Sequence, residues 1–164
     1  MPEKRQRDRL IALADAHPDW LLGFEDEVWW SRLASPALHA WAPEDQSLRL
    51  VEQVVATTDP DPKALACYGV CFPTTEEVWL RFLDGRPVSA VTTVFLDWCA
   101  QAAAARGMRV LALVWDNASW HRSKQVRIWV RAHNRQVKAS GQGVRLLICQ
   151  LPIKSPWRNP IEPK

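Results

Sequence analysis

The chain has 164 residues, of which 48% are hydrophobic and 24% charged, as expected for one globular domain with a sizeable core. No apolar stretch approaches the roughly 20 residues of a transmembrane helix, and the first residues lack the apolar segment of a signal peptide. We therefore expect a cytoplasmic protein without membrane contact. Its four cysteines form no Cys-x-x-Cys pair, which favours buried core thiols over a zinc site or disulfides.

The first half of the chain predicts a helix followed by antiparallel strands. A short basic helix is expected over residues 3–16 and a strand over residues 20–24, with residues 28–30 able to continue it. Prolines interrupt residues 31–64. Further strands are predicted over residues 48–56, 65–72 and 78–83.

The second half alternates helices with apolar strands. A helix is predicted from Ser89, as its N-cap, to Arg106, and a second helix over residues 119–139. Buried strands are expected over residues 109–115 and 144–151. This order predicts an α/β fold with a mixed sheet and helices on its faces, in which chemistry gathers at the strand ends.

Charge is unevenly distributed along the chain. Residues 116–164 carry ten Lys and Arg against two acids, a net charge of +8, whereas residues 1–115 carry a net charge of −5. Five basic residues fall within one narrow sector of the helix predicted at 119–139, namely Lys124, Arg127, Arg131, Arg135 and Lys138. This stripe fits a polyanion such as DNA, and a solvated helix face explains it equally well.

Three acids are placed at the ends of predicted elements. Asp116 ends an apolar strand, Glu162 follows Asn159-Pro160 at the start of a helix, and Asp26 lies in the run Glu25-Asp26-Glu27. Each has an alternative explanation: Asp116 as a helix cap, Glu162 as part of a capping box, and the run around Asp26 as an exposed acidic edge. Together the three carboxylates could hold divalent metal ions, which prefer oxygen ligands.

The remaining candidate residues give weaker indications of function. His121 follows Asp116 by five residues, and we expect it to support the loop rather than bind metal. Trp120 and Trp157 lie beside the acids, where an indole can stack on a nucleic-acid base. Serine-hydrolase, dinucleotide-binding and P-loop signatures are absent from the sequence.

The segments around the three acids resemble those of the DDE transposases of bacterial insertion sequences in the mariner superfamily. These segments are Phe24-Glu-Asp-Glu27, Trp115-Asp-Asn-Ala-Ser-Trp-His121 and Ser155-Pro-Trp-Arg-Asn-Pro-Ile-Glu-Pro-Lys164. The resemblance covers residues 20–164 and implies a ribonuclease-H-like fold. It also implies that Asp26, Asp116 and Glu162 are catalytic and bind two Mg²⁺ or Mn²⁺ ions.

The implied reaction is hydrolysis at transposon ends, followed by attack of a DNA 3′ hydroxyl on target DNA. The implied partners are transposon-end and target DNA, bound by a homodimer. Residues 1–19 would then be the remnant of a linker to a DNA-binding region. Residues 20–164 would be a catalytic domain that stops two residues after Glu162, short of the helix that supports this glutamate in the family.

Two other functions remain open at this stage. A non-catalytic remnant could bind DNA or dimerise, and inhibit an intact transposase. Another ribonuclease-H-like nuclease could cut nucleic acid without needing transposon ends.

Overall fold

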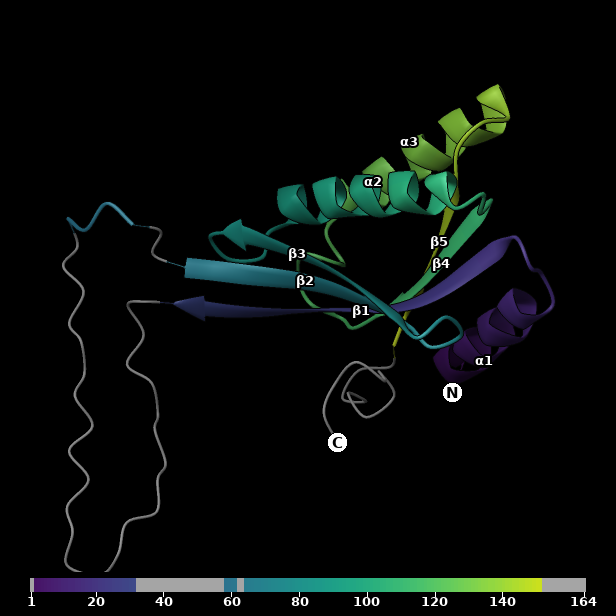
Figure 1. Ribbon diagram of the computed structural model, residues 1–164, viewed down its shortest axis with the longest axis horizontal. Helices are drawn as coiled ribbons and strands as arrows, with labels where there is room; N and C mark the ends of the chain where they lie inside the picture. Colours follow the sequence, from purple (N-terminus) through teal and green to yellow (C-terminus); the bar gives the residue numbers. More distant parts are fainter. Residues whose placement is uncertain (1, 32–57, 62–63, 152–164) are drawn as a thin grey trace, which may run out of the picture.

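A computed structural model describes residues 2–31, 58–61 and 64–151, so the strand expected at 48–56 lies outside the described residues. The chain forms a five-stranded mixed sheet in the order β3-β2-β1-β4-β5 (Figure 1). β1, β2 and β3 pair antiparallel, whereas β4 and β5 run parallel to β1. The strands are β1 Trp20–Ser31, β2 Ala64–Phe72, β3 Glu77–Asp84, β4 Val110–Trp115 and β5 Arg145–Gln150.

Helices cover both faces of this sheet. α2 (Ser89–Ala105) and α3 (Lys124–Ser140) pack on one face, and α1 (Pro2–Asp15) packs on the other (Figure 1). The predicted mixed α/β architecture is therefore confirmed. None of the helices in the described part of the chain has the length and apolar character needed to span a membrane.

Two cores result, one on each face. The larger lies under α2 and α3 and includes Tyr68, Leu96 and Trp115, while the smaller joins Leu10 of α1 to Phe24 of β1 and other residues of β1, β4 and β5. All six residues of β4 are buried, as expected for a strand covered on both faces.

β1 comes very close to its neighbour β2 on the α2 side. A Cβ atom added at Gly23 would lie 2.4 Å from a methyl carbon of Val70. Glycine is therefore required here for close packing. β1 then continues past the end of β4 to Ser31, with Val28 and Trp29 exposed.

Two helix starts differ from the prediction. α2 begins at Ser89, but its N-cap is Val88, which offers no side-chain cap. α3 begins at Lys124 rather than residue 119, because Ser123 is in an extended conformation and its hydroxyl accepts the N–H of Val126 at 3.2 Å. Residues 119–122 form turns and so remain in the loop that follows β4.

Candidate active site

The parallel pairing of β1 with β4 places two of the predicted acids at the same level. The pairing runs as far as Phe24 opposite Val114, two residues before Asp26 and Asp116 respectively. Phe24 and Val114 share the smaller core, and side chains alternate between the faces of a strand. Asp26 therefore lies just beyond the part of β1 that pairs with β4, and Asp116 is the first residue after β4, so both lie at the same edge of the β1–β4 pairing.

Two hydrogen bonds hold the Asp116 carboxylate. Its Oδ1 accepts the backbone N–H of Ala118 and the Nδ1–H of His121, both at 2.8 Å. Burial alone would raise the pKa of Asp116, but these bonds and the nearby imidazolium charge lower it below its usual value. The side chain is still 43% exposed, so an ionised carboxylate is available to a ligand from solvent.

His121 connects Asp116 to two acids of β1. Its Nε2 lies 2.8 Å from Glu27 Oε1 and 3.2 Å from Glu25 Oε2. The imidazole stacks on Trp115, with ring centroids 4.4 Å apart and planes 1° from parallel. These contacts fully bury the ring and fix its orientation.

Opposite charge maintains the buried cluster. Burial by itself would lower the pKa of His121, but the hydrogen bonds that the ring donates to Asp116, Glu25 and Glu27 outweigh it and raise this pKa to about 12. Burial and the neighbouring Glu27 charge raise the pKa of Glu25 to about 8. At neutral pH the cluster therefore contains the imidazolium of His121, beside an Asp116 carboxylate whose pKa is lowered and a Glu25 carboxyl whose pKa is raised.

Trp120 completes the site from the same loop. Its Nε1–H donates to Glu27 Oε1 at 2.9 Å, and its ring meets His121 edge-on. Asn117 donates its side-chain amide to the carbonyl of Leu151 beyond β5. The loop is thus attached to both neighbouring strands.

Two groups of side chains in this part of the structure could supply metal ligands. Ligand atoms of Glu25, Glu27 and His121 lie within 4.8 Å of one another. However, an imidazolium that uses both nitrogens as donors offers no lone pair to a metal. Asp26 and Asp116 are both partly accessible and supply the hard oxygen ligands that Mg²⁺ and Mn²⁺ favour, so they fit such an ion better.

The basic stripe is where the sequence predicts it. All five residues lie on α3 and are exposed, and none has a hydrogen bond or ion pair with another part of the described chain. α3 follows directly from the loop that carries Asp116, Trp120 and His121. The stripe therefore starts near the site and leads away from it: Lys124, Arg127, Arg131, Arg135 and Lys138.

Two alternatives weighed on the sequence prove wrong. Asp116 does not cap the next helix, since Ser123 does. The acidic run on β1 is not an exposed edge, since Glu25 is fully buried. The supporting role expected of His121 fits its contacts, whereas Glu162 and Trp157 lie outside the described residues.

Sequence reasoning missed the roles of Glu25 and Glu27. The signal was available in the strand alternation. Both residues share the parity of Leu21, a member of the larger core, and have the opposite parity to Asp26. Such a reading separates one outward acid from two acids on the α2 side, although it does not reveal that His121 joins them.

The sequence pattern of a family described as DDE superfamily endonuclease matches residues 24–163. The chain belongs to this family. No curated protein matches it in sequence.

Solved structures with a similar fold include three complexes of Mos1 transposase. They are a paired-end complex with the left transposon end (15% identity, TM-score 0.52), a mariner paired-end complex with Mn (14%, 0.54) and a pre-cleavage transpososome (13%, 0.53). Each match covers 96% of this chain and 44% of the other, so the chain spans less than half the length of these proteins. The similarity confirms the predicted ribonuclease-H-like fold for this DDE endonuclease domain.

Proposed function

We propose that this chain is the catalytic domain of a DDE transposase, acting on transposon ends and target DNA as a homodimer. Residues 20–164 would form this domain, and residues 1–19 would lead from a DNA-binding region. The family assignment supports this function. The observation that carries it is the register of β1 and β4, in which Phe24 pairs with Val114, two residues before Asp26 and Asp116 respectively.

The reaction has two steps at phosphorus. In the first, water attacks the phosphate at a transposon end and the bond to O3′ breaks, giving a 3′ hydroxyl and a 5′ phosphate. In the second, this hydroxyl attacks a phosphate of target DNA, and the displaced oxygen takes up the proton. Asp26, Asp116 and Glu162 would hold two Mg²⁺ or Mn²⁺ ions, which activate the attacking oxygen and stabilise the leaving oxygen when bound.

The side chains around Asp116 prepare it as a ligand. A metal-binding carboxylate must be deprotonated, and the hydrogen bonds from His121 and Ala118 favour that form. Both hydrogen bonds are accepted by Oδ1, so the loop backbone and the imidazole together fix the orientation of the carboxylate. His121 is therefore a positioning residue that acts through Asp116.

Calorimetric titration with Mn²⁺ tests the metal assignment. We expect binding to the wild-type chain and to a control Asp97→Ala, because Asp97 is exposed on α2 and bonded only locally to Gln101. Binding should disappear in Asp116→Ala. Equal Mn²⁺ binding by Asp116→Ala and the wild type would refute the assignment.

Cleavage of DNA carrying transposon ends tests the activity. Metal ions contribute several kcal/mol to transition-state stabilisation, so loss of the ligand Asp116 should slow cleavage by about 10³-fold or more. Cutting that needs no transposon ends would instead indicate another ribonuclease-H-like nuclease.

The basic stripe on α3 favours a second candidate function, DNA binding without catalysis. Its five exposed cations have no acidic partner among the described residues. Arg131→Gln should lower the slope of log affinity against log salt by about 1 without altering the fold. Salt-sensitive binding that persists in Asp116→Ala, without cleavage by the wild type, would favour this second function.

A further inference from the structure

β3 (Glu77–Asp84) lies at one edge of the sheet that the structure describes, where it pairs only with β2. Its antiparallel register with β2 runs without interruption from Glu77 opposite Phe72 to Asp84 opposite Leu65, so β3 contains no β-bulge. About half of its backbone N–H and C=O groups point away from β2 in such a pairing. No side chain among residues 2–31, 58–61 and 64–151 bonds to these groups, so the outer edge of β3 can accept another strand.

The opposite edge of the described sheet, formed by β5, is closed by a side chain. The amide nitrogen of Asn134 on α3 donates to the carbonyl of Leu146, and the amide oxygen accepts the N–H of the same residue, each at 2.8 Å. Edge strands are otherwise protected by Lys, by Pro or by a bulge. The sequence of β3, Glu-Val-Trp-Leu-Arg-Phe-Leu-Asp, contains neither Lys nor Pro. β3 is therefore an unprotected edge, in contrast to β5.

Three apolar side chains of β3 are exposed on the face of the sheet opposite α2. Val78, Leu80 and Phe82 are 54%, 50% and 62% exposed, whereas the residues that alternate with them face α2. The smaller core under α1 lies over β1, β4 and β5 and does not extend to β3. Val28 on β1 and Leu65 on β2 are exposed on the same face and enlarge this apolar surface.

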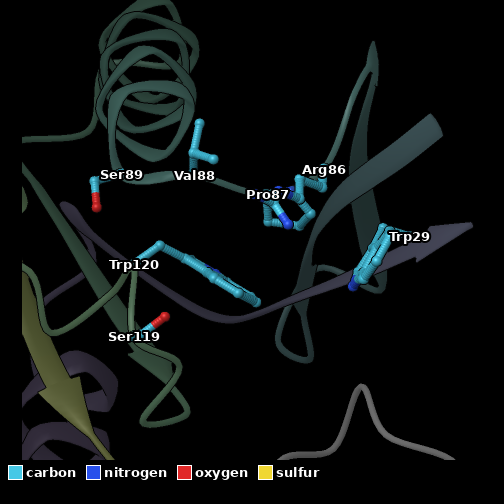
Figure 2. Close-up of a pocket in the computed structure, with 7 residues that line it drawn as sticks. All are labelled: Trp29, Arg86, Pro87, Val88, Ser89, Ser119 and Trp120. Carbon is cyan, nitrogen blue, oxygen red and sulfur yellow. The ribbon is translucent and has the colours of Figure 1, made fainter. Parts of the chain in front are cut away.

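Trp29 is not part of this surface. It follows Val28 on β1 and therefore points to the opposite face of the sheet. There Figure 2 shows it with Arg86 and Trp120, with which it lines a separate pocket. The exposed residues of β3 thus belong neither to the candidate active site nor to that pocket.

The charges along β3 suit pairing with the same strand of a second copy. A two-fold dimer pairs like strands antiparallel, and only registers that join equivalent faces keep the apolar residues together. With Trp79 on the two-fold axis, Glu77 lies opposite Arg81 of the second copy, and this pair occurs twice. In the same register Val78 lies opposite Leu80 of the second copy.

Neighbouring registers that join equivalent faces are less favourable. An axis at Leu80 would place Glu76 opposite Asp84, and an axis at Arg81 would place the two arginines opposite each other. Opposite charges directly across a strand pair stabilise it, and like charges destabilise it. Charge complementarity therefore selects the register with its axis at Trp79.

Both charged side chains can reach a second copy. Arg81 is exposed and stacks on Trp98, with its guanidinium carbon 4.1 Å from the ring centroid. The side chain of Glu77 is 47% exposed, and its bonds to Trp79 and Arg106 both use Oε2. Oε1 of Glu77 can therefore accept a guanidinium N–H from the second copy.

We propose that β3 is a homodimer interface, in which the β3 strands of two copies pair antiparallel about an axis at Trp79 and join the two sheets into one. This inference rests on the proposed function, since it assigns a surface to the homodimer assumed there. A single strand pair forms a small interface, below about 1,200 Å², of the kind found in transient complexes. We therefore expect a dissociation constant on the order of 10 µM.

Sedimentation velocity of the full chain without DNA tests the interface, at concentrations from about 1 to 100 µM that bracket this constant. The wild type should shift from monomer to dimer across this range. Leu80→Lys places a charge next to the axis and should keep the chain monomeric throughout. The matched control is Ile128→Lys on α3, because Ile128 is 53% exposed and Leu80 is 50% exposed. This control should dimerise as the wild type does.

Two charge reversals test the register. A homodimer of Glu77→Arg would set arginines opposite Arg81, and a homodimer of Arg81→Glu would set glutamates opposite Glu77. Each variant alone should associate about tenfold more weakly than the wild type, because like charges meet twice. In an equimolar mixture the heterodimer regains both ion pairs, so the mixture should dimerise with nearly wild-type affinity. Circular dichroism checks that each variant is folded, as expected for changes at exposed side chains.

The outcomes separate this inference from the proposed function. Dimerisation that persists unchanged in Leu80→Lys would refute the β3 interface and leave the proposed homodimer to another surface. A mixture that associates no better than the separate variants would refute the pairing about Trp79. A wild-type chain that stays monomeric at every concentration would refute the β3 interface, while cleavage of transposon ends would still decide the catalytic role.

Discussion

On the α2 side of β1, Glu25 and Glu27 lie around the imidazole of His121, and Glu25 is fully buried. On the other side, Asp26 is partly accessible, and its Oδ1 accepts the backbone N–H of Glu27 at 2.9 Å. Adjacent acids of one strand thus have different surroundings. The buried pair therefore supports the fold, whereas the partly accessible acid can be reached by a ligand, because burying a charge requires partners and holding a metal requires access.

Removing His121 should destabilise the buried cluster on the α2 side of β1. His121→Ala leaves Glu27 and Asp116 without their shared cation, and breaking a buried charge pair costs about 3–5 kcal/mol. The free energy of unfolding, measured by urea denaturation, should fall by that amount.

A histidine elsewhere provides the control for this change. His133 on α3 is half-buried and makes a single hydrogen bond to the carbonyl of Val144, so His133→Ala should cost only about 1 kcal/mol. Similar losses in both variants would mean that the cluster around His121 does not stabilise the fold beyond ordinary packing.

Neighbouring amide substitutions sharpen the comparison within β1. Glu27→Gln removes the charge that accepts from both His121 and Trp120, so it should cost about 1–3 kcal/mol. Asp26→Asn keeps an oxygen that can accept the N–H of Glu27 and alters a partly accessible side chain, so it should cost less than Glu27→Gln. Thermal or urea unfolding measures both, and a reversed order would contradict the assignment of the two sides.

Alkaline pH should gradually lower the free energy of unfolding through the buried His121 and Glu25. The folded pKa of His121 is raised from 6.5 to about 12, and that of Glu25 from 4.5 to about 8. In both cases the folded state binds the proton more tightly than the unfolded state. The stability that each group contributes is therefore complete below its unfolded pKa and is lost as pH rises toward its folded pKa.

Between pH 8 and 9 the His121 contribution should fall by at most about 1.4 kcal/mol. Urea midpoints of the metal-free chain measure this slope, and His121→Gln should make it flatter. An unchanged slope in that variant would assign the pH dependence to another group.

Much of the fold follows from local sequence patterns. The apolar run from Val110 to Trp115 predicts a doubly buried strand, and the spacing of basic and apolar residues after Ser123 predicts the two faces of α3. The helix starts were less predictable, because Ser89 and Ser119 are as suitable for capping as Ser123. For α3, only the path of the loop after β4 selects Ser123 over Ser119 as the cap.

The sequence by itself determined the order of helices and strands along the chain, the positions of Asp26 and Asp116 after apolar residues, and the basic face of α3. Each of these depends on short-range patterns of residues. Tertiary structure alone decided that β1 and β4 pair in the parallel register that brings the segments carrying these two acids to the same edge. It also decided that His121 reaches Glu25 and Glu27, residues more than 90 positions away in the chain. Such contacts depend on which strands become neighbours in the sheet, and residue spacing along the chain does not specify that choice.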